Sequence, residues 1–200
     1  MESRIRPRGH CGEHGHPRGH RGGRWGGALD PLPILERAGL GPGMSLLDLG
    51  SGAGRFSIPA AGVASRVHAI DISEDAVRSL LEEASRLGLG NLTASVGDAA
   101  GDLGFDGEFD MVLLANVLHG FVVAGTADRV LENARRALRP GGRVLVLEFK
   151  KDSPSPPGPP SYMRIREEDL IEIASRHGLE PIDRFEAGPH HYAVVFQRKS

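Results

Sequence analysis

Residues 46–56 read LLDLGSGAGRF, an apolar run that ends in an acid and continues into three glycines at alternate positions. A short apolar run bounded by glycine is typical of a buried parallel strand. Gly50, Gly52 and Gly54 then allow a tight turn and a close approach to a ligand before a helix begins. The dinucleotide fingerprint G-x-G-x-x-G does not fit, because its last glycine would stand at position 55, which is Arg55. The run therefore predicts a pocket for a nucleoside-bearing cofactor.

Strand-like and helix-like segments alternate from residue 29 to residue 149, which predicts an α/β fold with a parallel sheet and helices on its faces. The expected strands are 45–49, 67–70, 92–96, 109–115 and 144–149, and the expected helices are 55–64, 73–87 and 126–138. A Pro-rich loop at about 152–161, a helix at 167–177 and strand candidates at 181–186 and 192–197 follow. We expect residues 28–200 to form one domain.

Residues 1–27 differ from this body, because they contain eight glycines and almost no aliphatic side chains. We expect a disordered Arg/Gly/His-rich tail. Its five soft or borderline metal ligands are candidates for zinc, nickel or copper: His10, Cys11, His14, His16 and His20. Its arginines are also suited to weak contacts with RNA phosphates, and a plain extension is the third interpretation. We expect no metal in the body.

Charge and composition exclude several classes of protein. The tail carries six arginines against two acids, so the remaining body is acidic and offers no uniformly basic surface for nucleic acid. Cys11 is the single cysteine, which excludes an internal disulfide framework. The sequence has no apolar run of the roughly 18 residues that a membrane span needs and no signal-peptide pattern, so we expect a cytoplasmic protein.

Polar side chains follow four of the expected strands. Asp48 ends the first, Asp71 follows Gly50 by 21 positions at the end of the second, and Asp98 follows the third. The segment from Asn116 to His119 follows the fourth. In an open parallel sheet, ligands bind beyond the carboxyl ends of the strands. Each acid alone is explained equally well as a loop cap, but the joint pattern favours a ligand site.

These segments resemble the class I S-adenosylmethionine (SAM)-dependent methyltransferases: DLGSGAGRF is similar to motif I, AIDIS to motif II, VGDAA to motif III and FDMVLLANVLHG to motif IV. LRPGGRVLVLEF is similar to the turn and strand that follow in this superfamily. The resemblance implies a Rossmann-like, doubly wound seven-stranded sheet, mostly parallel, with an antiparallel last strand and helices on both faces. It implies SAM as cofactor and S-adenosylhomocysteine (SAH) as product.

The resemblance also implies roles for single residues. A loop would hold the methionine moiety: Asp48, Gly50, Ser51, Gly52 and Gly54. Asp71 would bind the ribose and Ile72 would pack on the adenine, while Asp98 and the Ala99 amide would bind the adenine edge. Asn116 would lie beside the methionine end and the reactive methyl group.

Methyl transfer from a sulfonium is an in-line displacement that needs alignment and desolvation, so a general base is optional. His119 is the candidate base, the alternative being a histidine packed on the following helix. Lys150, Tyr162 and His191 are candidates for substrate contact. We expect a small-molecule acceptor, with protein and RNA left open, and a monomer or homodimer.

Two other functions stay open at this point. A nicotinamide-dependent oxidoreductase on the same kind of sheet is disfavoured by Arg55 and by the lack of a Tyr-x-x-x-Lys pair. A non-catalytic nucleotide- or metal-binding module is the other alternative. Metalloid acceptors are rejected, because by resemblance such methyltransferases use several cysteines in the folded body and residues 28–200 contain none.

Overall fold

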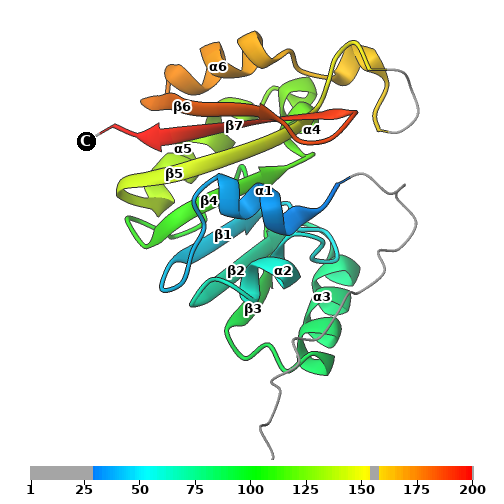
Figure 1. Cartoon of the computed structure of the whole chain (residues 1–200), viewed down its shortest axis with the longest axis vertical. Coiled ribbons are helices and arrows are strands. Elements are labelled where there is room, and N and C mark those ends of the chain that lie inside the picture. The colour runs from blue at the N-terminus through cyan, green and yellow to red at the C-terminus, as the bar shows by residue number, and fades with distance from the viewer. Residues whose placement is uncertain (1–28, 154–157, 200) are drawn as a thin grey trace, which may run out of the picture.

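Seven strands form one sheet in the order β3-β2-β1-β4-β5-β7-β6 (Figure 1). The structure is a computed structural model, and it describes residues 29–153 and 158–199. The strands are β1 (Ser45–Leu49), β2 (Arg66–Asp71), β3 (Leu92–Val96), β4 (Phe109–Ala115), β5 (Leu138–Phe149), β6 (Leu179–Glu186) and β7 (His191–Arg198). Strands β1 to β5 pair in parallel, and β7 runs antiparallel to both of its neighbours. The doubly wound sheet with an antiparallel last strand is confirmed.

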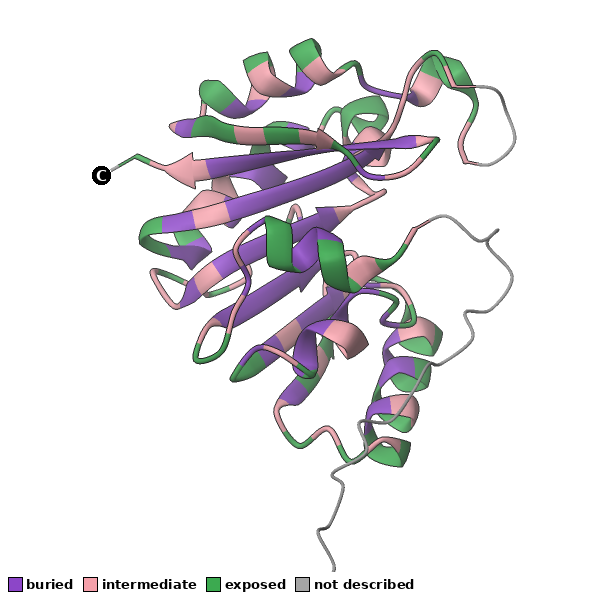
Figure 2. Ribbon diagram, viewed as in Figure 1, coloured by how far each residue is buried: buried purple, intermediate pink, exposed green. Residues whose placement is uncertain are grey.

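Helices cover both faces of the sheet. One face carries α1 (Pro31–Arg37), α2 (Ser57–Ala61) and α3 (Glu74–Arg86). The other carries α4 (Leu118–Ala124), α5 (Ala127–Ala137) and α6 (Glu167–Ser175), and a 3₁₀ turn, η1 (Ser161–Met163), precedes α6. In Figure 2 the buried residues fill the central strands and the inner sides of the helices. No helix in 29–153 or 158–199 is long and apolar enough to cross a membrane.

Two apolar clusters meet at the sheet. In β4, Met111 and Leu113 join the cluster under α1, α2 and α3, while Val112 and Leu114 join the cluster under α4, α5 and α6. All four side chains are fully buried. A nearly continuous apolar run is therefore what this central strand requires.

Local signals in the sequence fix several helix ends. Ser73 caps α3, because its side chain accepts from the Ala76 amide at 3.2 Å. Gly88 follows that helix with φ +69°, the left-handed conformation in which a helix commonly stops. Pro59 is the third residue of α2, where the missing amide hydrogen breaks no helical bond.

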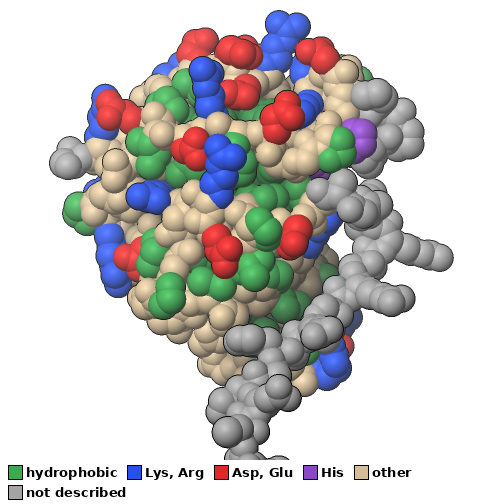
Figure 3. All heavy atoms as spheres, viewed as in Figure 1, with side chains coloured by type: hydrophobic (Ala, Val, Ile, Leu, Met, Phe, Trp, Pro, Cys, Tyr) green, Lys and Arg blue, Asp and Glu red, His purple; other side chains and the backbone are tan. Residues whose placement is uncertain are grey.

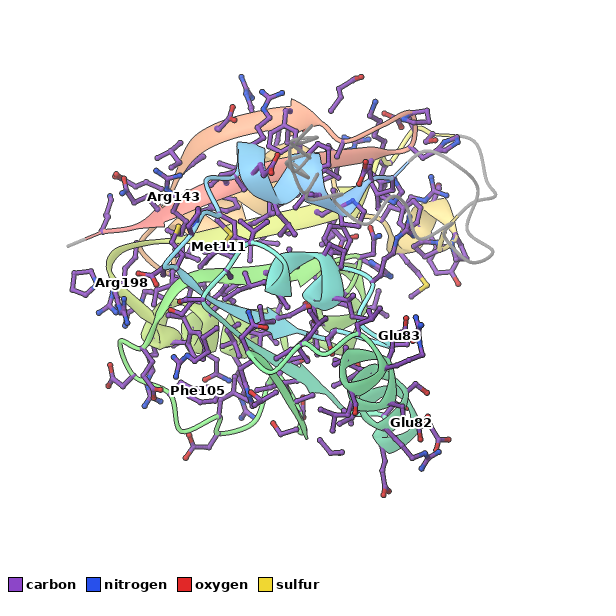
Figure 4. All side chains as sticks on the ribbon, turned by 60° about the horizontal axis from the view of Figure 1, so that its bottom comes forward. Glu82, Glu83, Phe105, Met111, Arg143 and Arg198 are labelled. Atoms are coloured by element: carbon purple, nitrogen blue, oxygen red, sulfur yellow. The ribbon has the colours of Figure 1, made fainter. Side chains whose placement is uncertain are left out.

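The structure differs from the sequence prediction at four places. Helices α1 and α4 were not expected, and α2 spans five residues rather than 55–64. Strand β5 starts at Leu138 instead of 144, because Leu138 pairs with Phe109 across a bulge. No helix was expected between β3 and β4 and none is found in the loop that joins them, whose Phe105, labelled in Figure 4, packs edge-to-face on Phe109 at 5.2 Å.

The predicted tail and its candidate ligands, His10, Cys11, His14, His16 and His20, lie outside the described residues, as does the middle of the Pro-rich loop. Within the described ranges there is no group of three or more His, Cys, Asp or Glu side chains arranged to hold a metal ion.

Candidate active site

The carboxyl ends of β1, β2, β3 and β4 meet at one edge of the sheet because these strands are parallel. This brings the loop after β1 beside the ends of β2 and β4. Arg143 and Arg198 lie toward the other edge (Figure 4), where the Arg143 guanidinium donates to the Ala38 carbonyl at 3.0 Å. The strand ends that carry the predicted polar residues are therefore gathered in one place.

The three glycines of the first loop share a left-handed backbone but have two different surroundings. All have positive φ values, +76° for Gly50, +54° for Gly52 and +87° for Gly54. A Cβ on Gly50 would lie 2.8 Å from Val117, and one on Gly54 would lie 2.2 Å from Leu80. A Cβ on Gly52 would meet no protein atom within 4 Å. Gly50 and Gly54 thus allow close packing, whereas Gly52 borders open space.

Asp71, at the end of β2, ties two loops together. One carboxylate oxygen accepts from the Gly52 amide at 2.7 Å, and the other accepts from the Ser73 amide at 2.9 Å. Each oxygen keeps a further lone pair for a ligand. Ile72 follows with 74% of its surface exposed, which is unusual for a large apolar side chain beside a sheet.

Asp98 and Ala99 lie in the loop after β3. Asp98 Oδ1 accepts from the Ala100 amide at 2.9 Å, and Ala99 is buried. Asn133, which sequence analysis did not single out, reaches this loop from α5. Its side-chain amide donates to the Ala99 carbonyl at 2.9 Å and to the Gly101 carbonyl at 2.6 Å. Asn133 lies 34 positions after Ala99, so no local pattern in the sequence indicates that the two residues are in contact.

Asp48 lies beneath the glycine loop and is buried, with 1% exposure. The Ser57 hydroxyl donates to its carboxyl group at 2.5 Å. Burial raises the pKa of Asp48 from 3.8 to about 7, with the Ser57 hydrogen bond lowering it and the negative charge of Asp71 raising it further. Ser51, in the loop above, is also buried.

Asn116, just past β4, is strained. Its φ of +58° is the one left-handed value among non-glycine residues of the described ranges. Its backbone amide donates to the Leu147 carbonyl at 2.7 Å. Its side-chain oxygen is buried and has no hydrogen-bond partner among residues 29–153 and 158–199, which leaves an acceptor for a bound group. Strain of this kind is common at functional sites.

His119 stands in the first turn of α4 and pairs with Glu148 of β5. Its Nδ1 lies 2.8 Å from one carboxylate oxygen, and its backbone amide donates to the other at 3.1 Å. Glu148 is fully buried. Sequence analysis did not pair Glu148 with His119, because a single acid at the end of an apolar strand gives no sign of which residue will approach it.

The three candidate substrate residues have different surroundings. Lys150 pairs with Glu186 at 2.8 Å, and Tyr162 is 79% exposed. His191 is buried against Phe149, with ring centres 4.1 Å apart, and its Nε2 has no hydrogen-bond partner in the part of the chain that the structure describes. Burial lowers the pKa of His191 to about 4, and the positive charges of Arg55, His190, Arg164 and Lys150 contribute in the same direction.

A hollow of about 910 Å³ lies near the end of β5, lined by residues that include Lys150, Arg166, Glu167, Glu186, His190 and Tyr192. None of the predicted cofactor residues lines it. The hollow lies beyond the carboxyl end of β5, and Asp71, Asp98 and Asn116 are not part of its lining.

Residues 40–176 match a family described as a methyltransferase domain. The chain belongs to this family and, with its fold and strand-end motifs, to the class I SAM-dependent methyltransferase superfamily. Its cofactor is accordingly SAM, with SAH as the product.

Curated relatives match over a little more than half of the chain. The chain is 33% identical to the ubiquinone/menaquinone biosynthesis C-methyltransferase UbiE of Hydrogenovibrio crunogenus, covering 58% of this chain and 46% of that one. It is 37% identical to the nocamycin O-methyltransferase of Saccharothrix syringae, covering 56% and 40%. The matches thus span less than half the length of these relatives.

Solved structures match more of the chain. A SAM-dependent methyltransferase from Aquifex aeolicus superimposes with a TM-score of 0.77 at 25% identity, covering 84% of this chain and 89% of that one. The [4+2]-cyclase SpnF superimposes with a TM-score of 0.72 at 20% identity, covering 84% and 79%. The second likeness concerns the fold alone, and it shows that this fold is not restricted to methyl transfer.

Proposed function

We propose that this protein transfers a methyl group from SAM to a small-molecule acceptor. The observation that carries the proposal is the gathering of Asp71, Asp98 and Asn116 at the edge that also holds the glycine loop. Together with membership of the methyltransferase family, this favours methyl transfer over hydride chemistry on a similar sheet.

The residues at this edge fit the cofactor. At Gly52 the loop backbone borders open space, so it can approach the methionine moiety closely. The Asp71 carboxylate keeps lone pairs for the ribose hydroxyls. Ile72 offers an exposed apolar surface for the adenine, and the unpaired Asn116 oxygen offers an acceptor at the methionine end. SAM, when bound, supplies an electrophilic methyl group on a positively charged sulfur.

Asp98 and the Ala99 amide are our candidates for the adenine edge, with the loop held by Asn133. Asp48 would support the glycine loop from beneath, and Ser51 lies buried within that loop. Asp48 also brings a carboxyl group under a site that would receive the cationic methionine end of SAM. An adjacent positive charge favours the ionised form of a carboxyl group.

A small acceptor is favoured over a macromolecule. The relatives' names mention ubiquinone, menaquinone and nocamycin, which are small molecules. Acidic and basic side chains are interspersed on the face drawn in Figure 3, so this face carries no patch of one sign for nucleic acid. His191 and Lys150 remain candidates for acceptor contact, and exposed Tyr162 is a third.

The proposal is tested by incubating the purified full-length protein with methyl-labelled SAM and a library of small metabolites. We expect label in a small-molecule product and SAH in equal amount. Label that appears only in added protein or RNA would contradict the small-molecule assignment. SAH formation that needs no acceptor would contradict methyl transfer altogether.

A further inference from the structure

Glu148 is a buried carboxylate whose one hydrogen-bonding partner among the described residues is His119. Both of its oxygens contact His119, one through Nδ1 at 2.8 Å and one through the backbone amide at 3.1 Å. Its side chain is 1% exposed and that of His119 is 13% exposed. A buried carboxylate is costly unless it is fully hydrogen-bonded. The two contacts therefore fix the imidazole in position and orientation relative to the end of β5.

The pairing also decides which ring nitrogen is free. A carboxylate only accepts hydrogen bonds, so Nδ1 of the neutral imidazole carries the hydrogen and Nε2 carries the lone pair. Nε2 has no hydrogen-bond partner in the described part of the chain, and it is absent from the buried unpaired atoms there. Nε2 is therefore open to solvent and to a bound molecule.

His119 is close in the chain to the methionine end of the site. It follows Asn116 by three residues, and the intervening Val117 packs against Gly50 of the cofactor loop. The unpaired oxygen of Asn116 lies in the same short segment. A lone pair held at this place is suited to removing a proton from an acceptor beside the methyl group.

We propose that Glu148 is a positioning residue that holds His119 as general base, and that the acceptor atom is a hydroxyl oxygen, as in a phenol or an enol. This rests on the proposed function. The acceptor O–H proton moves to His119 Nε2, the oxygen lone pair forms the C–O bond, and the C–S bond breaks with its electron pair on sulfur. The imidazolium then returns its proton to solvent.

A thiol ionises readily near neutral pH and a tertiary amine has no proton to lose, so neither needs such a base. A phenolic hydroxyl, with a pKa near 10, does. The simpler explanation of Glu148 is that it caps α4, whose N-cap residue Val117 makes no side-chain hydrogen bond. Glu148→Gln separates the two, because the amide oxygen still accepts from the His119 backbone while the charge is lost.

The first measurement is the protonation of the His119 ring, by nitrogen NMR of the histidine-labelled protein at pH 8. We expect hydrogen on Nδ1 in the unmodified protein and a shift toward Nε2 in Glu148→Gln. Glu186→Gln, which removes an 80% exposed acid, is the matched control and should change nothing. A ring with hydrogen on Nε2 before the substitution, or unchanged by it, would overturn the role of Glu148.

The second measurement uses a set of phenols and the matching thiophenols with methyl-labelled SAM. We expect labelled phenols, with a loss of about 10²–10⁴-fold in Glu148→Gln, the range a positioned general base contributes. Transfer to phenols that Glu148→Gln leaves intact would overturn the positioning role of Glu148. Transfer to thiophenols alone, or to neither set, would overturn the hydroxyl assignment. SAH binding, measured by calorimetry, should be the same in Glu148→Gln and in the unmodified protein. Failure of the unmodified protein to bind SAH would instead count against the proposed function.

Discussion

Folding strongly alters the ionisation of Asp48. Its pKa is about 7 in the folded chain, compared with an ordinary value of 3.8, because the carboxyl group is buried. Between these values the folded state binds more protons than the unfolded state, so the free energy of unfolding falls as pH rises from about 4 to about 7. Above pH 7 this contribution no longer changes.

Asp48→Asn should therefore be more stable than the unmodified chain at pH 8, by an amount on the order of 3 kcal/mol, and should approach it at pH 4. Urea unfolding of both proteins across this pH range measures the difference. Asp102→Asn, in the exposed loop before β4, is a suitable control. A difference that does not vary with pH would mean that Asp48 is ionised throughout.

At the scale of elements, two glycines of the same loop have different roles, Gly54 in folding and Gly52 in ligand binding. Gly52→Ala and Gly54→Ala both place a Cβ at positive φ, which costs roughly 1–2 kcal/mol. Only Gly54→Ala also collides with buried Leu80, on α3, so it should lose about 1–3 kcal/mol more. Thermal and urea unfolding measure both effects.

SAH binding should be impaired more by Gly52→Ala than by Gly54→Ala, the reverse of their order in stability. Gly52→Ala directs its methyl group into the space we assign to the methionine moiety, so it should abolish SAH binding while the protein stays folded. Gly54→Ala should bind SAH when it is studied below its melting temperature. Equal SAH affinity in Gly52→Ala and the unmodified protein would show that the open side of this loop does not face the cofactor.

The strands and their polar ends could be predicted because their signals are local. Buried strands are continuous apolar runs, and the acids and glycines that follow them are read directly from the chain. Helices α1 and α4 were missed because each has only seven residues, too few to show a clear helical period. The LHGFVVA sequence of α4 also contains a glycine and two valines, which are poor helix formers.

The missed pairings depend on contacts between distant parts of the chain. Glu148 and His119 are 29 positions apart, and Asn133 lies 34 positions from Ala99. Glu148 meets His119 because α4 brings that histidine onto the end of β5, so the pairing could not be seen before α4 was known. Such pairings follow from the order of the strands rather than from any local pattern.

At the scale of the whole molecule, we propose that residues 28–200 form the catalytic domain and that 1–27 are dispensable for cofactor binding. Every residue assigned to the cofactor lies between Asp48 and Asn116. Deleting residues 1–27 should leave the SAH dissociation constant unchanged and should remove any bound nickel or zinc. Calorimetry and elemental analysis measure the two. Metal that persists after the deletion would have to bind within the body.

The central claim is that the edge formed by the carboxyl ends of β1, β2, β3 and β4 binds an adenosyl cofactor. Calorimetric titration of SAM, SAH and NAD, into the unmodified protein and Asp71→Asn, tests it most directly. We expect SAM and SAH to bind and NAD not to bind, and Asp71→Asn to weaken SAH binding by about 1.5–3 kcal/mol, roughly 10- to 150-fold. Binding of NAD alone, or SAH affinity that is unchanged in Asp71→Asn, would contradict the account.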